Sequence, residues 1–185
     1  MKTYFRQYRP FFIFLFKFFA VYAALTIIYS LYLNQFDSLI VFEVDNFTQL
    51  VARQVQQLLL WLHYECSITI HNSQASIKLF LDHVYVARVV EGCNALSVII
   101  LFAAFVVAFS GRFRHTVFFI LGGSVLIHIL NVIRIALLSI ALLHYPEYQE
   151  FLHGVVFPLF IYGVVFGLWV IWVNKFSNYA SETPQ

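Results

Sequence analysis

Long apolar runs constrain the fold of this chain more than any other feature. A run of roughly 20 apolar residues can cross the hydrocarbon core of a bilayer as a helix. Hydrophobic residues make up 62% of the 185 residues and charged residues only 11%, and a soluble domain of this length could not bury so much apolar surface. The net charge of +2 is too small to indicate a nucleic-acid partner. We therefore expect an all-α, multi-pass protein embedded in the lipid bilayer.

Candidate membrane spans follow one another along the chain. The first contains only Lys17 as a charge. The second is short unless the GCN turn and part of VYVARVV lengthen it, and the third is long enough that it should tilt or protrude. Pro158 falls near the start of the fourth, where a proline costs a helix least. The expected spans are residues 11–33, 94–109, 116–143 and 155–173 of a single membrane-embedded domain that covers residues 1–185.

Basic residues in the short flanks of these runs indicate how the chain crosses the membrane. Cytoplasmic flanks are enriched in Lys and Arg. With four crossings, three basic flanks lie on the same side: the one before the first span, the turn between the second and third spans, and the one after the fourth span. This side is then the cytoplasm. We expect both termini there and the other two loops outside. The basic residues of these flanks are Lys2, Arg6, Arg9, Arg112, Arg114 and Lys175.

The outer loop, residues 34–88, is the only sizeable segment outside the expected spans. Asp45 is a candidate N-cap, and the apolar residues that follow it at helical spacing predict an amphipathic helix on the membrane or on the bundle. The runs CSITI and IKLFL flank the polar HNSQAS, a pattern typical of a small β-hairpin. The apolar positions of the helix are Phe47, Leu50, Val51, Val55, Leu58, Leu59 and Leu62.

Three chemically active side chains reach a similar depth on different spans. Cys93 begins the second span, in the stretch EGCN at the outer face. Arg134 follows Thr116 by about 27 Å of helix at about 1.5 Å per residue, so it lies near the outer boundary of the hydrocarbon core. His153 opens the fourth span from the outside. A thiol beside Arg and His has the electropositive surroundings that lower a cysteine pKa and make it a nucleophile.

Each of these side chains also has a simpler interpretation. A cysteine in an apolar run is usually a small hydrophobe, and Cys66 is also outside, so a Cys66–Cys93 disulfide is the natural alternative in an oxidising compartment. An arginine near a span end often snorkels. His144, nine residues before His153, is the alternative candidate for the histidine of the site. Yet an intramembrane arginine is costly and tends to be retained for a partner. Asn131 shares the helix face of Arg134 and could orient it.

These motifs resemble a known family. EGCN before an apolar helix, NVIRI in the next helix and HG at the start of another resemble the exosortase/archaeosortase family of polytopic membrane cysteine transpeptidases, most closely its short exosortase F type. The resemblance covers roughly residues 85–173. This chain has fewer spans than the larger members, and it has a histidine where archaeal relatives have an arginine. The catalytic set that the resemblance implies is Cys93, Arg134 and His153. From the sequence itself we add Asn131, Glu91 and Asn94 as candidate supporting residues.

The resemblance implies acyl transfer at the outer face of the cytoplasmic (inner) membrane. The Cys93 thiolate would attack a peptide carbonyl near the C-terminus of an exported protein and form a thioester. His153 would pass a proton to the leaving amine, and Arg134 would stabilise the oxyanion or the thiolate. Family substrates carry a short motif, a transmembrane helix and a basic tail. An amine, a hydroxyl or water accepts the acyl group, and neither a cofactor nor a metal is expected.

Other interpretations stay open at this point. Water as the acceptor would make the protein a simple protease. Haem or metal binding would use some of the seven histidines, but only His128 lies deep in a span and it has no partner at matched depth. A non-catalytic assembly or scaffold subunit would pack through the small residues Gly163 and Gly167, hold the Cys66–Cys93 disulfide and tolerate the loss of Cys93. Glu91 either tunes the thiol or pairs with Arg88 or Arg134.

Overall fold

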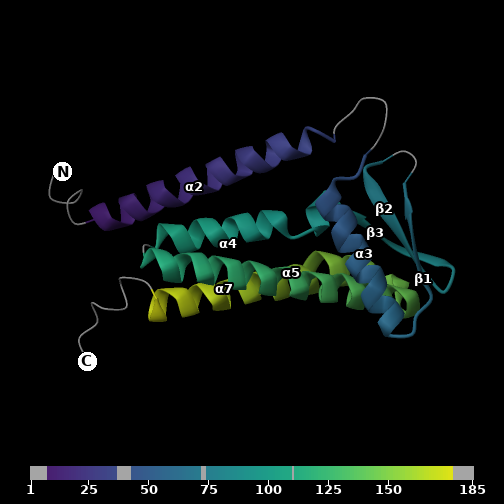
Figure 1. The fold of residues 1–185 in the computed structure, drawn as a ribbon. Helices are drawn as coiled ribbons and strands as arrows, with labels where there is room; N and C mark the ends of the chain where they lie inside the picture. Colours follow the sequence, from purple (N-terminus) through teal and green to yellow (C-terminus); the bar gives the residue numbers. More distant parts are fainter. Residues whose placement is uncertain (1–7, 37–42, 72–73, 110, 177–185) are drawn as a thin grey trace.

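The helices of the protein lie side by side and end against a layer formed by a small sheet and a crossing helix (Figure 1). The computed structural model describes residues 8–36, 43–71, 74–109 and 111–176. The predicted flank residues Lys2 and Arg6 and parts of the predicted outer loop, 37–42 and 72–73, lie outside the described residues. The side-by-side helices are α2 (Arg9–Leu33), α4 (Leu96–Ala108), α5 (Phe113–His144) and α7 (Phe157–Lys175). Helix α2 packs on α4, and α4, α5 and α7 pack on one another.

Three helical segments of the described chain are long and apolar enough to cross a membrane: Arg9–Leu33, Phe113–His144 and Pro146–Lys175. They coincide with the first, third and fourth predicted spans. The last begins earlier than predicted, because short helical turns lead directly into α7. Pro158 lies in the first turn of α7, as predicted. The turns that precede α7 are η2 (Pro146–Tyr148), α6 (Gln149–Phe151) and the π-helical turn η3 (Leu152–Val156).

Helix α4 is shorter than a membrane crossing requires. Its 13 residues correspond to about 20 Å of helix, less than the roughly 30 Å of a hydrocarbon core. The expectation that part of VYVARVV lengthens this span is wrong, because these residues form strand β3 (Val84–Val90). Strand and helix are separated by a turn that includes Ala95 in the left-handed region, with φ of 65°. The count of four crossings therefore stays a prediction.

The fold is mostly helical, but the prediction of an all-α protein is wrong at one end of the bundle, where a small sheet lies. The described residues form a three-stranded antiparallel sheet of order β1-β2-β3, in which β1 is Cys66–Ile70 and β2 is Ser76–Leu81. Its β1-β2 hairpin is the one predicted, and β3 is additional. The turn from β2 to β3 is Asp82-His83, both with positive φ, as a two-residue hairpin with a type I′ turn requires. Valine-rich β3 suits a half-buried pleated surface.

Helix α3 (Asn46–Trp61) is the predicted amphipathic helix. The Asp45 carboxylate accepts hydrogen bonds from the backbone N–H groups of Phe47 and Thr48, at 3.0 and 2.9 Å, so the predicted N-cap is confirmed. The buried face of α3 packs on the sheet and on α5, whereas Leu50 and Leu62 are exposed. The fully buried apolar residues of this face are Val51, Ala52, Val55 and Leu59.

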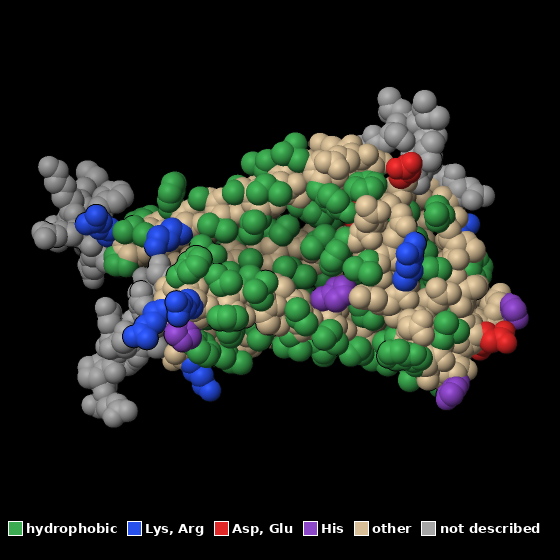
Figure 2. Space-filling model, viewed as in Figure 1, with side chains coloured by type: hydrophobic (Ala, Val, Ile, Leu, Met, Phe, Trp, Pro, Cys, Tyr) green, Lys and Arg blue, Asp and Glu red, His purple; other side chains and the backbone are tan. Residues whose placement is uncertain are grey.

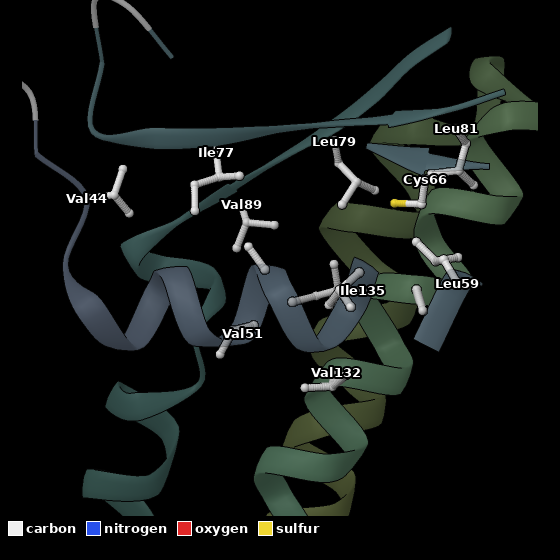
Figure 3. Close-up of a cluster of buried hydrophobic side chains, with 13 residues drawn as sticks. Val44, Val51, Leu59, Cys66, Ile77, Leu79, Leu81, Val89, Val132 and Ile135 are labelled. Atoms are coloured by element: carbon white, nitrogen blue, oxygen red, sulfur yellow. The ribbon is translucent and has the colours of Figure 1, made fainter. Parts of the chain in front are cut away.

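Two clusters of buried apolar side chains hold these layers together. In the first, the sheet-end cluster, side chains from α3, the sheet and α5 point toward one another (Figure 3); its α5 members are Val132, Ile135 and Ala136. The second, the bundle cluster, lies among α4, α5 and α7. The bundle cluster consists of Ala95, Phe102, Val106, Ile127, Val165 and Trp172.

Charged side chains lie at the two ends of the molecule, with an apolar surface between them (Figure 2). Lys and Arg side chains gather at the end farthest from the sheet, where α2 begins and α7 ends. Arg9, Arg112, Arg114 and Lys175 belong to this end. The acidic side chains visible in this view lie at the sheet end. The helices thus expose an apolar belt, with most of the basic side chains visible in this view at the end away from the sheet.

Candidate active site

A cavity of about 480 Å³ opens between β3, α5 and the turns that precede α7. Cys93, Arg134 and His153 all line this cavity, although they come from three separate parts of the chain. The competing histidine, His144, is exposed at the end of α5 and is not among the lining residues. The predicted set is therefore brought together around one space, and the geometry favours His153 over His144 as its histidine.

Cys93 ends η1 (Glu91–Cys93), a single 3₁₀ turn that connects β3 to the start of α4. Its side chain is half-buried. The Asn131 side-chain amide on α5 donates a hydrogen bond of 2.8 Å to the Cys93 backbone carbonyl. Asn131 therefore has a different contact from the one predicted: it fixes the backbone of the candidate nucleophile, and no hydrogen bond joins it to Arg134 among the described residues.

Asn94 is buried directly after the candidate nucleophile and ties three helices together. Its amide nitrogen donates to the Tyr29 hydroxyl on α2 and to the Thr48 hydroxyl on α3, both at 3.1 Å. Its carbonyl oxygen accepts from the backbone N–H of Leu96 at 2.9 Å, which satisfies a donor at the start of α4. The turn that carries Cys93 is thus held from several sides at once.

Glu91 has a partner that none of the sequence alternatives included. The Tyr29 hydroxyl donates to its carboxylate at 2.7 Å, while Arg88 donates to the side chain of Gln74. Neither Tyr29 nor Thr48 was singled out from the sequence. Tyr29 does carry a signal, since it is a polar-tipped residue at the outer end of the first apolar run. Its partners are 62 and 65 residues away, and no local pattern identifies them.

Arg134 presents an unused donor near the thiol. The side chain is half-buried on α5, and within the described part of the chain its buried Nε has no hydrogen-bond partner. The guanidinium lies close enough to Cys93 for an electrostatic interaction between them. Leaving a buried donor unpaired is costly, so this group is suited to an anion or carbonyl oxygen that enters the cavity.

His153 lies in the π-helical turn η3 and is exposed to the cavity mouth. A π-helical turn places one extra residue in a helix and is frequent at functional sites. Here the turn lies where the segment that follows α5 leads into α7. An exposed imidazole at this place can exchange protons with solvent and with a group in the cavity, as acid–base catalysis requires.

Cys66 has surroundings opposite to those of Cys93. It is buried in the sheet-end cluster, and burial raises the pKa of its thiol to about 11. Since the thiolate is the reactive form, Cys66 is inert at neutral pH. Neither cysteine forms a disulfide within the described structure.

His128, the deep histidine, pairs with a polar side chain of α3. One of its ring nitrogens, Nε2, lies 2.7 Å from Oε1 of Gln54, and its ring packs against Phe47. In the described ranges, no group of three or more His, Cys, Asp or Glu side chains could hold a metal ion. The haem and metal interpretations therefore gain no support from the arrangement of these residues.

No protein-family model, curated protein or solved structure matches this chain. Its function is therefore argued from the cavity and from the side chains around it.

Proposed function

We propose that this protein is a membrane cysteine transpeptidase or peptidase of the exosortase type, which cleaves a C-terminal sorting signal of exported proteins. One observation carries the proposal: Cys93, Arg134 and His153, a thiol, a guanidinium and an imidazole, line the same cavity. This is the combination that nucleophilic acyl transfer requires, namely a nucleophile, an oxyanion donor and a proton shuttle. The same residues on unrelated surfaces would not support it.

In this mechanism the Cys93 thiolate attacks the scissile carbonyl of the substrate, and a carbon–sulfur bond forms. The guanidinium of Arg134, which lines the cavity, stabilises the developing oxyanion. The carbon–nitrogen bond then breaks, and His153 supplies the proton that the leaving amine needs. An amine, a hydroxyl or water attacks the thioester, the carbon–sulfur bond breaks and the thiol is regenerated. Asn131 and Asn94 keep the turn that carries Cys93 in position throughout.

The distribution of charge supports a defined orientation in the cytoplasmic membrane. Lys and Arg residues gather at the end of the bundle away from the sheet (Figure 2), and such clusters face the cytoplasm. Both termini are then cytoplasmic, and the sheet, α3 and the cavity face outward. A substrate whose transmembrane helix lies beside the bundle would present the peptide bond just outside that helix to Cys93. Its basic tail would stay on the cytoplasmic side.

The test compares the two cysteines of the chain. Cys93→Ala and Cys93→Ser remove the nucleophile, and we expect both to abolish processing of a co-expressed exported protein that ends in a short motif, a transmembrane helix and a basic tail. Processing is measured as a size shift on immunoblots, and insertion as the amount of variant in the membrane fraction. Cys66→Ala is the matched control and should retain most of the activity. Identical behaviour of the Cys66→Ala and Cys93→Ala variants would contradict catalysis by Cys93 and favour the disulfide interpretation.

A further inference from the structure

Strand β3 is an edge strand of the sheet, because the strand order is β1-β2-β3. Its pairing with β2 uses one edge of its backbone. Among the residues that the structure describes, none hydrogen-bonds to the backbone of β3 along its other edge. An edge with unused N–H and C=O groups is a template for a further strand.

The candidate cavity runs along this unused edge. Six successive residues, Tyr85–Val90, line it. Successive side chains of a strand point to opposite faces of the sheet, so a cavity against one face would be lined by every second residue. Contact with an unbroken run is expected of a space that follows the edge of the strand. Its volume of about 480 Å³ is within the range of roughly 300–1,000 Å³ that is usual for ligand sites.

The direction of β3 connects this edge to the candidate nucleophile. Val90 ends the strand, and η1 follows at once with Cys93 as its last residue. A β-bulge between the residues that pair with Leu79 and Phe80 bends the strand, and bulges often re-aim strands beside active sites. A peptide aligned with β3 would therefore be guided along the strand to the thiol.

The charges around the cavity disfavour a positively charged occupant. Its charged or titratable lining groups within the described chain are Arg88, Arg134, His153, the Cys93 thiol and the Tyr85 hydroxyl, with no Asp or Glu among them. A lysine- or arginine-rich segment would be repelled. The basic tail of a substrate is thus excluded from this space, whereas the uncharged stretch on the exported side of its transmembrane helix is not.

We propose that this stretch of the substrate, the extended segment that precedes its transmembrane helix, binds as an added strand along the free edge of β3. The inference rests on the proposed function and specifies how that site holds its substrate. An exported protein approaches its transmembrane helix from outside, and β3 also runs toward the membrane-facing start of α4 (Figure 1). The added strand is therefore parallel to β3, and its last carbonyl reaches Cys93.

Strand addition has a consequence that distinguishes it from a side-chain pocket. Main-chain hydrogen bonds provide the affinity, and amides of the bound peptide face β3 only at every second residue. Removing amide hydrogens from one alternate set should therefore weaken binding, and removing them from the other set should not. In a pocket that recognises side chains, the effect of removing an amide hydrogen would not alternate from one residue of the peptide to the next.

The experiment uses the full chain in detergent and peptide chloromethyl ketones as probes. The parent probe is acetyl-Ala-Val-Ala-Val-Ala chloromethyl ketone, and two matched isomers carry N-methyl groups on the first and third or on the second and fourth residues counted from the ketone. The Cys93 sulfur displaces chloride and forms a carbon–sulfur bond, and mass spectrometry locates the label. We expect one isomer to react about tenfold more slowly, the order expected for two lost hydrogen bonds, and the other to keep nearly the parent rate.

Iodoacetamide, which needs no strand, is the control for thiol reactivity. Cys66 serves as an internal control and should stay unlabelled at neutral pH, because burial raises the pKa of its thiol. If iodoacetamide labels Cys93 and both isomers react at the same rate, strand addition is wrong while the proposed function stands. If no reagent labels Cys93, both are wrong. A peptide reaction that slows as protein concentration rises would mean that a second copy of the chain covers the edge.

Discussion

The sheet-end cluster and the bundle cluster share one long helix, α5, but their other surroundings differ. Around the sheet-end cluster, α3 and the strands bury one face, and polar residues of α3 such as Arg53 and Gln57 are exposed on the other side of the helix. The bundle cluster lies among helices that are apolar on nearly every side. Burial from water can drive the first arrangement. In a membrane that force is absent between helices, so close packing of shapes must hold the second.

The candidate site lies where the two clusters meet along α5. Ile127 belongs to the bundle cluster and Ile135 to the sheet-end cluster, while Asn131 and Arg134 lie close to the boundary and interact with Cys93. Neither side chain belongs to the apolar packing of either cluster. Changes at the half-buried Arg134 should therefore affect processing more than stability, whereas changes inside a cluster should do the reverse.

The largest expected effect concerns which side of the membrane each region occupies. Reporter fusions after Lys78, in the sheet, and after Lys175, at the end of α7, should report opposite sides, with the Lys78 fusion outside. The basic end of the bundle is the physical reason. Signals from the same side would overturn the four-crossing map and the outward orientation of the cavity.

The next effect separates two histidines of the same outer segment. His153→Ala should slow turnover by about 100- to 10,000-fold, the usual contribution of acid–base catalysis. His144→Ala removes an imidazole that does not line the cavity, and it should leave turnover nearly unchanged. Both variants are assayed side by side against the same substrate. An inactive His144→Ala variant beside an active His153→Ala variant would show that the assignment of the proton shuttle to His153 is wrong.

Substitutions of Arg134 test whether this residue contributes hydrogen-bond donors to the reaction or only a positive charge. Arg134→Lys keeps the positive charge but loses the planar set of donors, and we expect a loss of about 100- to 1,000-fold, as for removal of one oxyanion donor. Arg134→Gln should lose more activity, because the charge is also removed. The measurement is the processing rate per inserted molecule. A nearly silent Arg134→Lys would mean that the side chain merely snorkels.

The smallest effect on turnover is expected inside the bundle cluster. A Cβ atom at Gly123 would lie 2.4 Å from the ring of Phe102, which is fully buried, so Gly123→Ala should cost about 1–3 kcal/mol of unfolding free energy through overpacking. Gly122→Ala is the matched control, since it meets no atom within 4 Å. Unfolding in mixed detergent measures the difference, and turnover per folded molecule should not change. A drop in turnover for Gly123→Ala would show that the two clusters are coupled.

The same contrast explains what could be predicted from the sequence. Asp45 marks the start of α3 as an N-cap. The apolar residues that follow recur at helical spacing among polar ones, so the helix and most of its buried face were predictable. The apolar runs of α2, α5 and α7 were equally clear from their length. The three candidate catalytic residues could be selected from the sequence because Cys93 and His153 lie at the ends of apolar runs and Arg134 is a charge within one.

Other features were not predictable for physical reasons. β3 and α4 follow each other as nearly continuous apolar sequence, and hydrophobicity alone does not distinguish a short strand from the beginning of a helix. The short span at residues 94–109 was predicted, but whether VYVARVV extends it as a helix could not be decided from the sequence. The bonds that join Tyr29 to Glu91 and Asn94 depend on tertiary packing. So does the contact of Asn131 with the Cys93 carbonyl.

The position of α5 in the chain also determines the order in which parts of the fold can assemble during biosynthesis. α3 and the strands leave the ribosome before α5, yet the sheet-end cluster includes Val132, Ile135 and Ala136. Chains begin to fold from the N-terminus as they are made. The sheet-end cluster therefore cannot form completely until α5 has been synthesised. The turn that carries Cys93 receives its bond from Asn131 at the same stage. A nascent chain stalled before α5 would thus hold Cys93 without its bond from Asn131, and the candidate site would be complete only after α5 and η3 have been added.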